Sequence, residues 1–296
     1  MSKLREKLQS SKFILTSEIS PPRSASLEKF RAEARQCTAD AINVTDYSGA
    51  LQTMSGLGAS IALMQEKKEP IYQVTVRDRN TLGLQGDLIA AGAFGIENIL
   101  ALTGDSPRIG DQKQAKPVYE ITSVDLVKLC LLLNKGETLG GVKLKVPTKF
   151  CVGSALTPGH RDLKNEVSKM QKKIDAGTQF FQSQPLFSRG EIERFVSEYE
   201  KHSGESAKKM LKLSIIGVLP LHDLSVMPIL KSLPCLFIPK ELEERMSVAQ
   251  KKGKLREEAK AHAIELVDAI KEIGFAGAHV LPMGDVRLFE EIKKEV

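Results

Sequence analysis

The chain contains no tryptophan, and aromatic residues make up only 5% of its 296 positions. A protein that binds single-stranded nucleic acid by base stacking needs an aromatic platform, which this chain does not offer. Its formal net charge is +6 and its pI is near 9.0, but the Lys and Arg residues are spread along the sequence. We therefore expect anionic ligands or acidic partners, and no nucleic acid.

Cysteine is also scarce, and its spacing excludes several kinds of site. Cys37, Cys130, Cys151 and Cys235 form no C-x-x-C pair, and no histidine lies at metal-ligand spacing from them. We expect buried free thiols in a reducing cytoplasmic environment, with neither zinc nor an iron–sulfur cluster. The first twelve residues carry charges without a following apolar segment, and no apolar run is long enough for a membrane span. We therefore predict neither a signal peptide nor membrane insertion.

Eight short apolar segments alternate with longer amphipathic segments. The predicted strands are 13–19, 41–45, 71–76, 98–103, 150–154, 180–184, 214–219 and 278–282. Eight β–α units in a chain of this length predict an α/β protein, a single (β/α)8 TIM barrel over residues 1–296 without a regulatory extension. The alternative is an open doubly wound sheet, which usually has a G-x-G-x-x-G turn after its first strand. This chain has Ser20-Pro21-Pro22-Arg23 there instead.

Polar side chains gather at the ends of six predicted strands, where such barrels carry their chemistry. Gly104 lets the backbone approach a ligand closely. A single polar residue at a strand end can simply start a turn, so Asp105 taken alone has this structural alternative. The set consists of Glu18, Thr45, Asp46, Gln73, Thr75, Arg77, Asp105, Ser154, Gln182 and Gln184.

Glu18 has the most distinctive surroundings of this set. Ile19 and the stiff Pro21-Pro22 pair follow it. A carboxyl group in an apolar barrel mouth should have a raised pKa, which suits a general acid near neutral pH. The structural alternative is a carboxylate paired with Arg23 or Arg77.

A second cluster lies on a predicted helix and on the strand that follows it. Lys169 and Lys173 are four residues apart on one helical face, with Glu166 one turn before. Two ammonium groups on one face can hold a pyrophosphate, although a solvated helix face has the same pattern. The strand ends at Gln184, whose amide both donates and accepts and suits the edge of a heteroaromatic ring. The histidines form no triad or metal pattern and no serine lies in a nucleophile elbow, which argues against a hydrolase or a zinc enzyme.

Seven stretches together resemble the methylenetetrahydrofolate reductase family, flavin-dependent (β/α)8 barrels of one-carbon metabolism. They occur in family order over nearly the whole chain, and they are SEISPPR, NVTDYSGA, QVTVRDRN, NILALTGDSP, KIDAGTQFFQSQPLF, GVLPL and GAHVLPMG. The resemblance implies reduction of 5,10-methylenetetrahydrofolate to 5-methyltetrahydrofolate, with hydride from reduced flavin. It favours FAD over FMN as the cofactor.

The resemblance also assigns roles to individual residues. Glu18 matches the glutamate that, as a general acid, assists opening of the folate's five-membered ring to the reactive iminium. Asp105 matches an aspartate near both flavin and pterin, whose charge influences both, and Gln184 matches a glutamine that binds folate. Other matches lie at or beside positions that hold the flavin, namely Thr45, Asp46, Gln73, Thr103, Gly104, Tyr119, Glu166, Lys169 and Lys173. We also expect Ser154 to bind the cofactor.

The chain departs from the family pattern at several positions. Gln73 stands where well-studied members have His, and Leu156 is nearest to the place of a flavin-contacting Tyr. Leu224 stands where some members have a Phe that stacks on the nicotinamide, and Gly284-Asp285 replaces a frequent Asn-Arg pair. These changes put direct use of NADH or NADPH in question. We hypothesise that the flavin takes its electrons from a partner protein.

The alternative from another functional class is a folate-binding barrel without reductase activity of its own. Such a barrel would be a subunit of a methyl-transfer or electron-transfer complex. In either case we expect a homo- or hetero-oligomer.

Overall fold

The computed structural model describes residues 2–233 and 235–296. Its parallel strands close into a barrel in chain order, and the last strand pairs with the first. The (β/α)8 barrel predicted from the sequence is therefore confirmed, and the open sheet is wrong. The strands are β1 Ile14–Glu18, β2 Ile42–Val44, β3 Pro70–Thr75, β4 Asn98–Leu102, β5 Cys151–Leu156, β6 Phe180–Pro185, β7 Ser214–Val218 and β8 Gly277–Val280.

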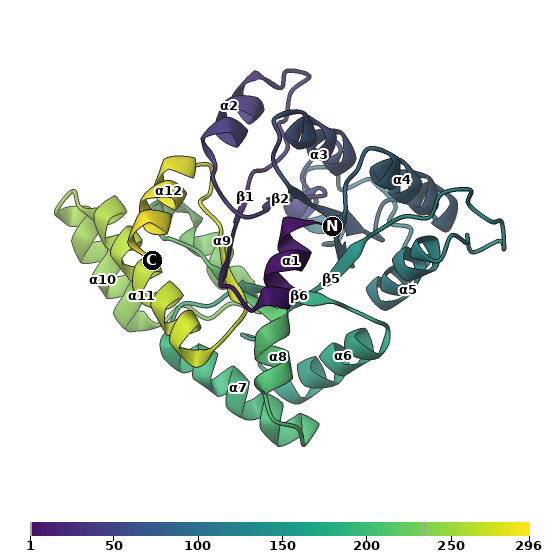
Figure 1. The fold of residues 1–296 in the computed structure, drawn as a ribbon. Coiled ribbons are helices and arrows are strands. Elements are labelled where there is room, and N and C mark those ends of the chain that lie inside the picture. The colour runs from purple at the N-terminus through teal and green to yellow at the C-terminus, as the bar shows by residue number, and fades with distance from the viewer. Residues whose placement is uncertain (1, 234) are drawn as a thin grey trace.

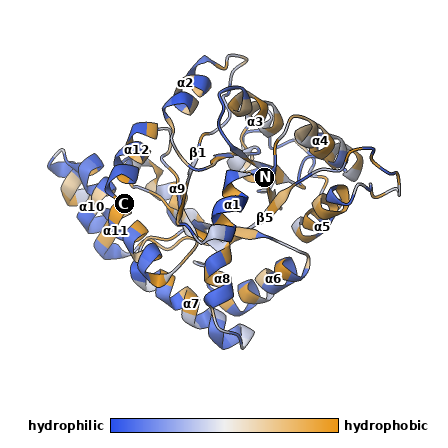
Figure 2. Ribbon diagram, in the orientation of Figure 1, coloured by the Kyte–Doolittle hydropathy of each residue, from blue (hydrophilic) through white to orange (hydrophobic). Residues whose placement is uncertain are grey.

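Helices surround the barrel, and Figure 1 views them from the end where α1 lies across the strands. Figure 2 shows that hydrophilic residues are frequent on most of these helices, whereas α3, α4 and α5 are more hydrophobic. The helices are α1 Lys3–Ser10, α2 Glu28–Gln36, α3 Gly56–Gln65, α4 Thr81–Ala93, α5 Ser123–Asn134, α6 Leu163–Asp175, α7 Arg189–Ser203, α8 Lys208–Leu213, α9 Met227–Ser232, α10 Lys240–Lys251, α11 Leu255–Ile273 and α12 Val286–Glu295. Short 3-10 turns occur at η1 Ser48–Ala50, η2 Pro107–Ile109 and η3 Leu224–Val226.

The barrel interior changes from apolar to polar toward the carboxyl ends of the strands. The lowest layer is an apolar cluster that includes Ile14, Phe180 and, from α1, Leu4. Gly153 makes room for the ring of Phe180, because a Cβ at position 153 would lie 2.3 Å from that ring. This apolar layer closes the end of the barrel opposite the site.

The next layer is a buried hydrogen-bonded network. The amide of Asn43 donates to Gln182 Oε1 (2.6 Å), and the amide of Gln182 donates to Asn43 Oδ1 (3.1 Å) and Thr16 Oγ1 (3.2 Å). Thr16 Oγ1 lies 3.0 Å from His279 Nδ1, and burial lowers the pKa of His279 to about 4. Because these polar groups have partners, they can stay buried at little cost. They form the floor of the site.

Two further sequence expectations concern thiols and membranes. Cys37, Cys130 and Cys151 are buried free thiols, as predicted, whereas Cys235 is only half-buried. Along residues 2–233 and 235–296, no helix has the length and apolar character needed to cross a membrane.

Candidate active site at the barrel mouth

A main cavity of about 600 Å³ opens at the carboxyl ends of the strands from β2 to β6. Its volume lies in the range of small-molecule and cofactor sites. Most of the predicted site residues line it, namely Asp46, Gln73, Thr103, Gly104, Asp105, Glu166, Lys169, Lys173 and Gln184. The fold thus brings together side chains that are up to 138 positions apart, from 46 to 184.

Glu18 ends β1 beside this cavity and is linked to it through Gln73. Its side chain is half-buried, and Gln73, which lines the cavity, forms a hydrogen bond with it. Burial raises the pKa of Glu18 to about 7, and the hydrogen bond from Gln73 offsets this only in part. Both protonation states are therefore accessible near neutral pH, as a general acid requires.

The two arginines considered as partners of Glu18 are engaged elsewhere. Arg23 forms an ion pair with Asp111 and donates to the backbone oxygen of Gln52. Arg77 binds the carboxylate of Asp78 through Nε and Nη2, both at 2.8 Å. The structure does not support the alternative that Glu18 is a structural ion-pair partner.

Asp105 is held at the cavity by its own loop and by the loop after β2. Gly104 has φ +87°, and a Cβ there would lie 3.0 Å from the Cβ atoms of both Thr75 and Arg77. Glycine is needed at this position for its backbone conformation and for space. The exposed carboxylate of Asp105 accepts a hydrogen bond from the backbone N–H of Gly49 (3.0 Å), which fixes its direction.

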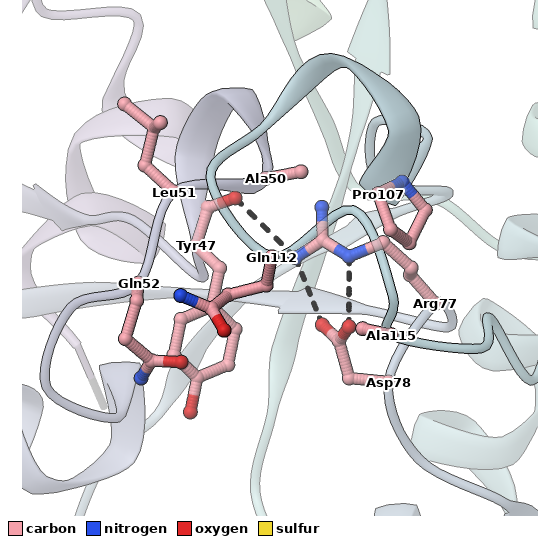
Figure 3. Close-up of a pocket in the computed structure, with 9 residues that line it drawn as sticks. All are labelled: Tyr47, Ala50, Leu51, Gln52, Arg77, Asp78, Pro107, Gln112 and Ala115. Carbon is pink, nitrogen blue, oxygen red and sulfur yellow. Dashed lines mark hydrogen bonds and ion pairs between the residues drawn. The ribbon is translucent and has the colours of Figure 1, made fainter.

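A smaller pocket of about 230 Å³ adjoins the main cavity and shares Tyr47 and Arg77 with it. Figure 3 shows the guanidinium of Arg77 between the carboxylate of Asp78 and the backbone oxygen of Tyr47. Arg77 is 2% exposed and also donates to the backbone oxygens of Asp46 (3.4 Å) and Asp105 (3.1 Å). One buried side chain therefore ties together the loops that follow β2, β3 and β4.

Asp46 combines a structural contact with a free oxygen. Its Oδ2 accepts hydrogen bonds from the backbone N–H (2.8 Å) and hydroxyl (2.9 Å) of Thr75, and it forms an ion pair with Arg79. Burial raises the pKa of Asp46, while Arg79 lowers it. The second oxygen, Oδ1, is buried and has no hydrogen-bond partner in the part of the chain that the structure describes.

Two predicted flavin-binding residues lie beside the cavity rather than in its wall. Thr45 is 3% exposed and is not among the lining residues. Tyr119 is half-exposed, and its hydroxyl donates to the backbone oxygen of Gly104 (3.2 Å). Tyr119 therefore supports the loop that carries Asp105.

The helix α6 makes one end of the cavity cationic. Glu166 is buried and accepts a hydrogen bond from the backbone N–H of Thr157 (2.9 Å), and its other oxygen lies 3.7 Å from Lys169 Nζ. Lys173 donates to the backbone oxygen of Ala155 (2.6 Å), and burial lowers its pKa. The two predicted lysines therefore differ, since Lys173 is fixed against β5 while Lys169 is half-exposed.

The strand β5 faces the cavity with different residues from those predicted. Ala155 and Thr157 line the cavity, and because strand side chains alternate, their neighbours point away from it. Ser154 is completely buried, and its hydroxyl lies 2.9 Å from that of Thr178. The structure thus does not support Ser154 as a cofactor-binding residue. Leu156, which is nearest in sequence to the position of the family's flavin-contacting Tyr, is also buried and does not line the cavity. Its neighbour Thr157 does.

Sequence reasoning missed several residues in the cavity wall. Thr122 and Ser123 start α5, where Thr122 and Asp125 form a reciprocal capping box. The pattern of Thr followed three residues later by an acidic residue could have shown this helix start. Lys172 lines the cavity as well, adding a third ammonium group to the α6 end.

Known proteins resemble this chain in sequence and in fold. The family model for methylenetetrahydrofolate reductase matches residues 3–296. The chain belongs to this family. Methylenetetrahydrofolate reductase 2 of Schizosaccharomyces pombe is 25% identical over 197 residues, which are 63% of this chain and 28% of that protein. The chain thus matches little more than a quarter of that relative's length.

Solved structures support the fold. A protein from Clostridium thermocellum that binds two copies of 5-methyl-5,6,7,8-tetrahydrofolic acid has a TM-score of 0.68 at 16% identity, covering 99% of this chain and 100% of that one. A 2,3-dimethylmalate lyase has a TM-score of 0.51 at 12% identity, covering 100% of this chain and 84% of that one. At such identities the likeness shows the barrel alone.

Two of the departures from the methylenetetrahydrofolate reductase pattern have structural roles here. Leu224 packs against the apolar cluster that contains Phe187 and Leu221. Asp285 caps α12 by accepting from the backbone N–H of Leu288 (3.0 Å), and its other oxygen binds Arg256 (2.9 Å). These side chains hold the loops after β7 and β8 in place.

Proposed function

We propose that this chain reduces 5,10-methylenetetrahydrofolate to 5-methyltetrahydrofolate with a flavin bound in the main cavity. The observation that carries the proposal is Glu18, a carboxyl group with a pKa of about 7 beside a polar cavity lined by Asp105 and Gln184. Family membership supports the same reaction. The Clostridium thermocellum protein of similar fold binds 5-methyltetrahydrofolate, which is the product of the proposed reaction.

The residues of the main cavity fit a flavin nucleotide. Lys169, Lys172 and Lys173 together would hold its phosphates at the α6 end. Asp46 lies in the same wall, where its fully buried side chain holds the backbone N–H and the hydroxyl of Thr75. We favour FAD over FMN because the chain belongs to the methylenetetrahydrofolate reductase family. Bound reduced flavin would supply the hydride.

Glu18 would act as the general acid of this reaction. In its protonated form it would donate a proton to the folate nitrogen that leaves the methylene carbon, opening the five-membered ring. Gln73 holds the carboxyl group in place by its hydrogen bond. A pKa of about 7 keeps much of the group protonated at neutral pH, whereas an ordinary glutamate would be ionised.

Asp105 and Gln184 would position the folate. The amide of Gln184 is exposed at the end of β6 and lines the cavity, where it can both donate to and accept from a pterin edge. The carboxylate of Asp105, fixed by Gly49, would attract the cationic form that develops when the ring opens.

The test begins with the visible spectrum of the purified chain. We expect bound flavin, and we expect anaerobic addition of 5-methyltetrahydrofolate to bleach it by the reverse reaction. A spectrum that stays flat after FAD and FMN have been offered would instead favour a folate-binding subunit of a larger complex. Loss of both flavin and folate binding would contradict the proposal as a whole.

A partner protein is our second proposal, as the source of the electrons. Leu224 offers no aromatic face to a nicotinamide, and Asp285 is engaged with Arg256. Stopped-flow reduction of the flavin by NADH and by NADPH, with dithionite as the control, tests this. Slow reduction by both nucleotides supports a protein donor, and reduction within one turnover time contradicts it. The free thiols suit a reducing, cytoplasmic setting.

A further inference from the structure

The outer face of α4 is apolar although it is exposed to solvent, and Figure 2 shows this helix largely in the hydrophobic colour. Leu82 is 78% exposed, Ile89 is 36% exposed and Phe94, just after the helix, is 57% exposed. The sequence of α4 contains a single charged residue, Asp87, whose carboxylate is paired with Arg79 (3.0 Å). A solvent-exposed helix face normally carries charged and polar residues, so this face is typical of a protein–protein contact.

The loop after α5 extends the apolar face of α4. The backbone N–H of Leu139 donates to Gln85 Oε1 of α4 (2.8 Å), which holds the loop beside the helix. Three side chains of this loop are more than half exposed, namely Leu139, Val142 and Val146. We call the exposed side chains of both segments the α4 patch, which consists of Leu82, Ile89, Phe94, Leu139, Val142 and Val146.

The α4 patch is large enough for a specific interface. Its six side chains together expose roughly 600 Å², which is at the upper end for an apolar patch on a monomer. Two such patches in contact would bury about 1,200 Å², the lower limit for a stable protein–protein interface. A second copy of the chain can therefore supply all the apolar area that the contact needs.

The exposed residues of α4 are also complementary in size to those of a second α4. Four of them, spaced i, i+4, i+7 and i+11, form one stripe along the helix, namely Leu82, Gly86, Ile89 and Ala93. If two α4 helices pack antiparallel around a two-fold axis, Leu82 lies opposite Ala93 of the second copy. Ile89 then lies opposite Gly86 of the second copy. A large side chain meets a small one at each position of the stripe, whereas a parallel pair would place identical residues opposite each other.

Gly86 has no structural reason within its own chain. A Cβ at this position would meet no other atom within 4 Å, and the backbone is ordinary helix. Glycine in a helix interior is about 1 kcal/mol less favourable than alanine. A second helix packed at this point explains the glycine, because the missing side chain makes room for Ile89 of the second copy.

We infer that the α4 patch joins two copies of this chain in a two-fold symmetric dimer. The two α4 helices pack antiparallel, and the symmetry axis passes between Gly86 and Ile89. A contact of this kind uses the same surface on both copies, so it closes after two chains and leaves no patch free. The inference is independent of the proposed function, since no residue of the α4 patch lines the main cavity.

Sedimentation equilibrium of the full chain tests the dimer. Wild type at about 10 µM should have twice the 32.5 kDa mass of one chain. Gly86→Ile places a large side chain opposite Ile89 of the second copy, twice in each dimer, and should weaken association at least about thirtyfold. The matched control is Gly190→Ile in α7, another exposed helical glycine with open space around its Cβ, and it should leave the dimer intact.

Two further variants sharpen the test. Gly86→Ile/Ile89→Gly exchanges the large and the small residue and should restore the dimer, because each again lies opposite its counterpart. Leu82→Lys introduces a charge at a position outside the core of the monomer, so the fold should be retained while association is weakened. Far-UV circular dichroism of each variant confirms that the chain is folded.

Four results would overturn the inference. A wild type that is monomeric at about 100 µM would mean that another protein covers the α4 patch. A dimer that persists in both Gly86→Ile and Leu82→Lys would place the contact on another surface. Equal weakening by Gly190→Ile would show that the effect is not specific to α4. Failure of the exchange variant to dimerise would contradict the antiparallel pairing.

Discussion

The two halves of the barrel mouth are built differently. At the carboxyl ends of β2 to β6, polar groups converge on the main cavity, and the buried Arg77 ties together the loops after β2, β3 and β4. In the loops after β7 and β8, Leu224 packs into an apolar cluster and Asp285 caps a helix. The first region, which we call the cavity half, positions polar side chains for a ligand. The second region, the β7–β8 half, uses its side chains to stabilise its own loops. This contrast underlies the proposal that folate chemistry is retained while the electron donor has changed.

Replacing Glu18 should give the largest effect in the cavity half. Glu18→Gln keeps the size and the hydrogen bond to Gln73 but removes the acid. We expect oxidation of the reduced flavin by 5,10-methylenetetrahydrofolate to slow by about 10²–10⁴-fold, the usual contribution of a general acid. Stopped-flow absorbance measures the rate, and the flavin spectrum of the variant controls for lost cofactor. A rate within threefold of wild type would remove Glu18 from the mechanism.

Replacing Arg77, which joins the loops after β2, β3 and β4 by hydrogen bonds, should mainly lower the free energy of unfolding. Arg77→Gln removes the donors of three backbone oxygens and the partner of the partly exposed Asp78 carboxylate, and leaving buried acceptors unsatisfied costs about 1–3 kcal/mol. Urea unfolding measures this loss. The control is Arg108→Gln in the loop after β4, an exposed residue whose replacement should change stability by less than about 0.5 kcal/mol. Equal losses in both variants would show that the loops do not depend on Arg77.

Glu18 should also make stability depend on pH. Its pKa is about 7 in the folded protein and 4.5 when unperturbed, so between these values the folded state holds more protons than the unfolded state. The stability of wild type should therefore fall relative to Glu18→Gln as the pH rises from about 5 through 7. Chemical unfolding of both proteins at several pH values measures the difference. Parallel curves would show that the carboxyl group is not perturbed.

Substitutions in the loops after β7 and β8 should lower the free energy of unfolding slightly and leave the reaction rate unchanged. Asp285→Ala removes the α12 cap and the ion pair with Arg256, which should cost about 1–2 kcal/mol. Asp285→Asn keeps the cap and should cost less than about 1 kcal/mol. Folate-dependent bleaching of the flavin should remain unchanged in both. If either variant lowers the bleaching rate tenfold, the β8 loop belongs to the folate site and the contrast between the halves fails.

The sequence predicted the barrel well because its strands are short, apolar and separated by helix-forming segments. It could not show which side chains of a strand face inward. Strands of a parallel barrel are buried on both faces and lack an alternating pattern. For this reason Ser154 was placed in the site, although Ala155 and Thr157 line the cavity. The sequence also could not predict the hydrogen bonds of Arg77, because their acceptors lie in loops that only the fold brings together.

The most direct test of the account is the pH profile of the rate at which 5,10-methylenetetrahydrofolate oxidises the reduced flavin. If Glu18 is the general acid, the wild-type rate should be level at low pH and fall about tenfold per pH unit above about pH 7. Glu18→Gln should be slow and nearly independent of pH over the same range. A wild-type rate that does not change between about pH 6 and 9 would contradict the role given to Glu18.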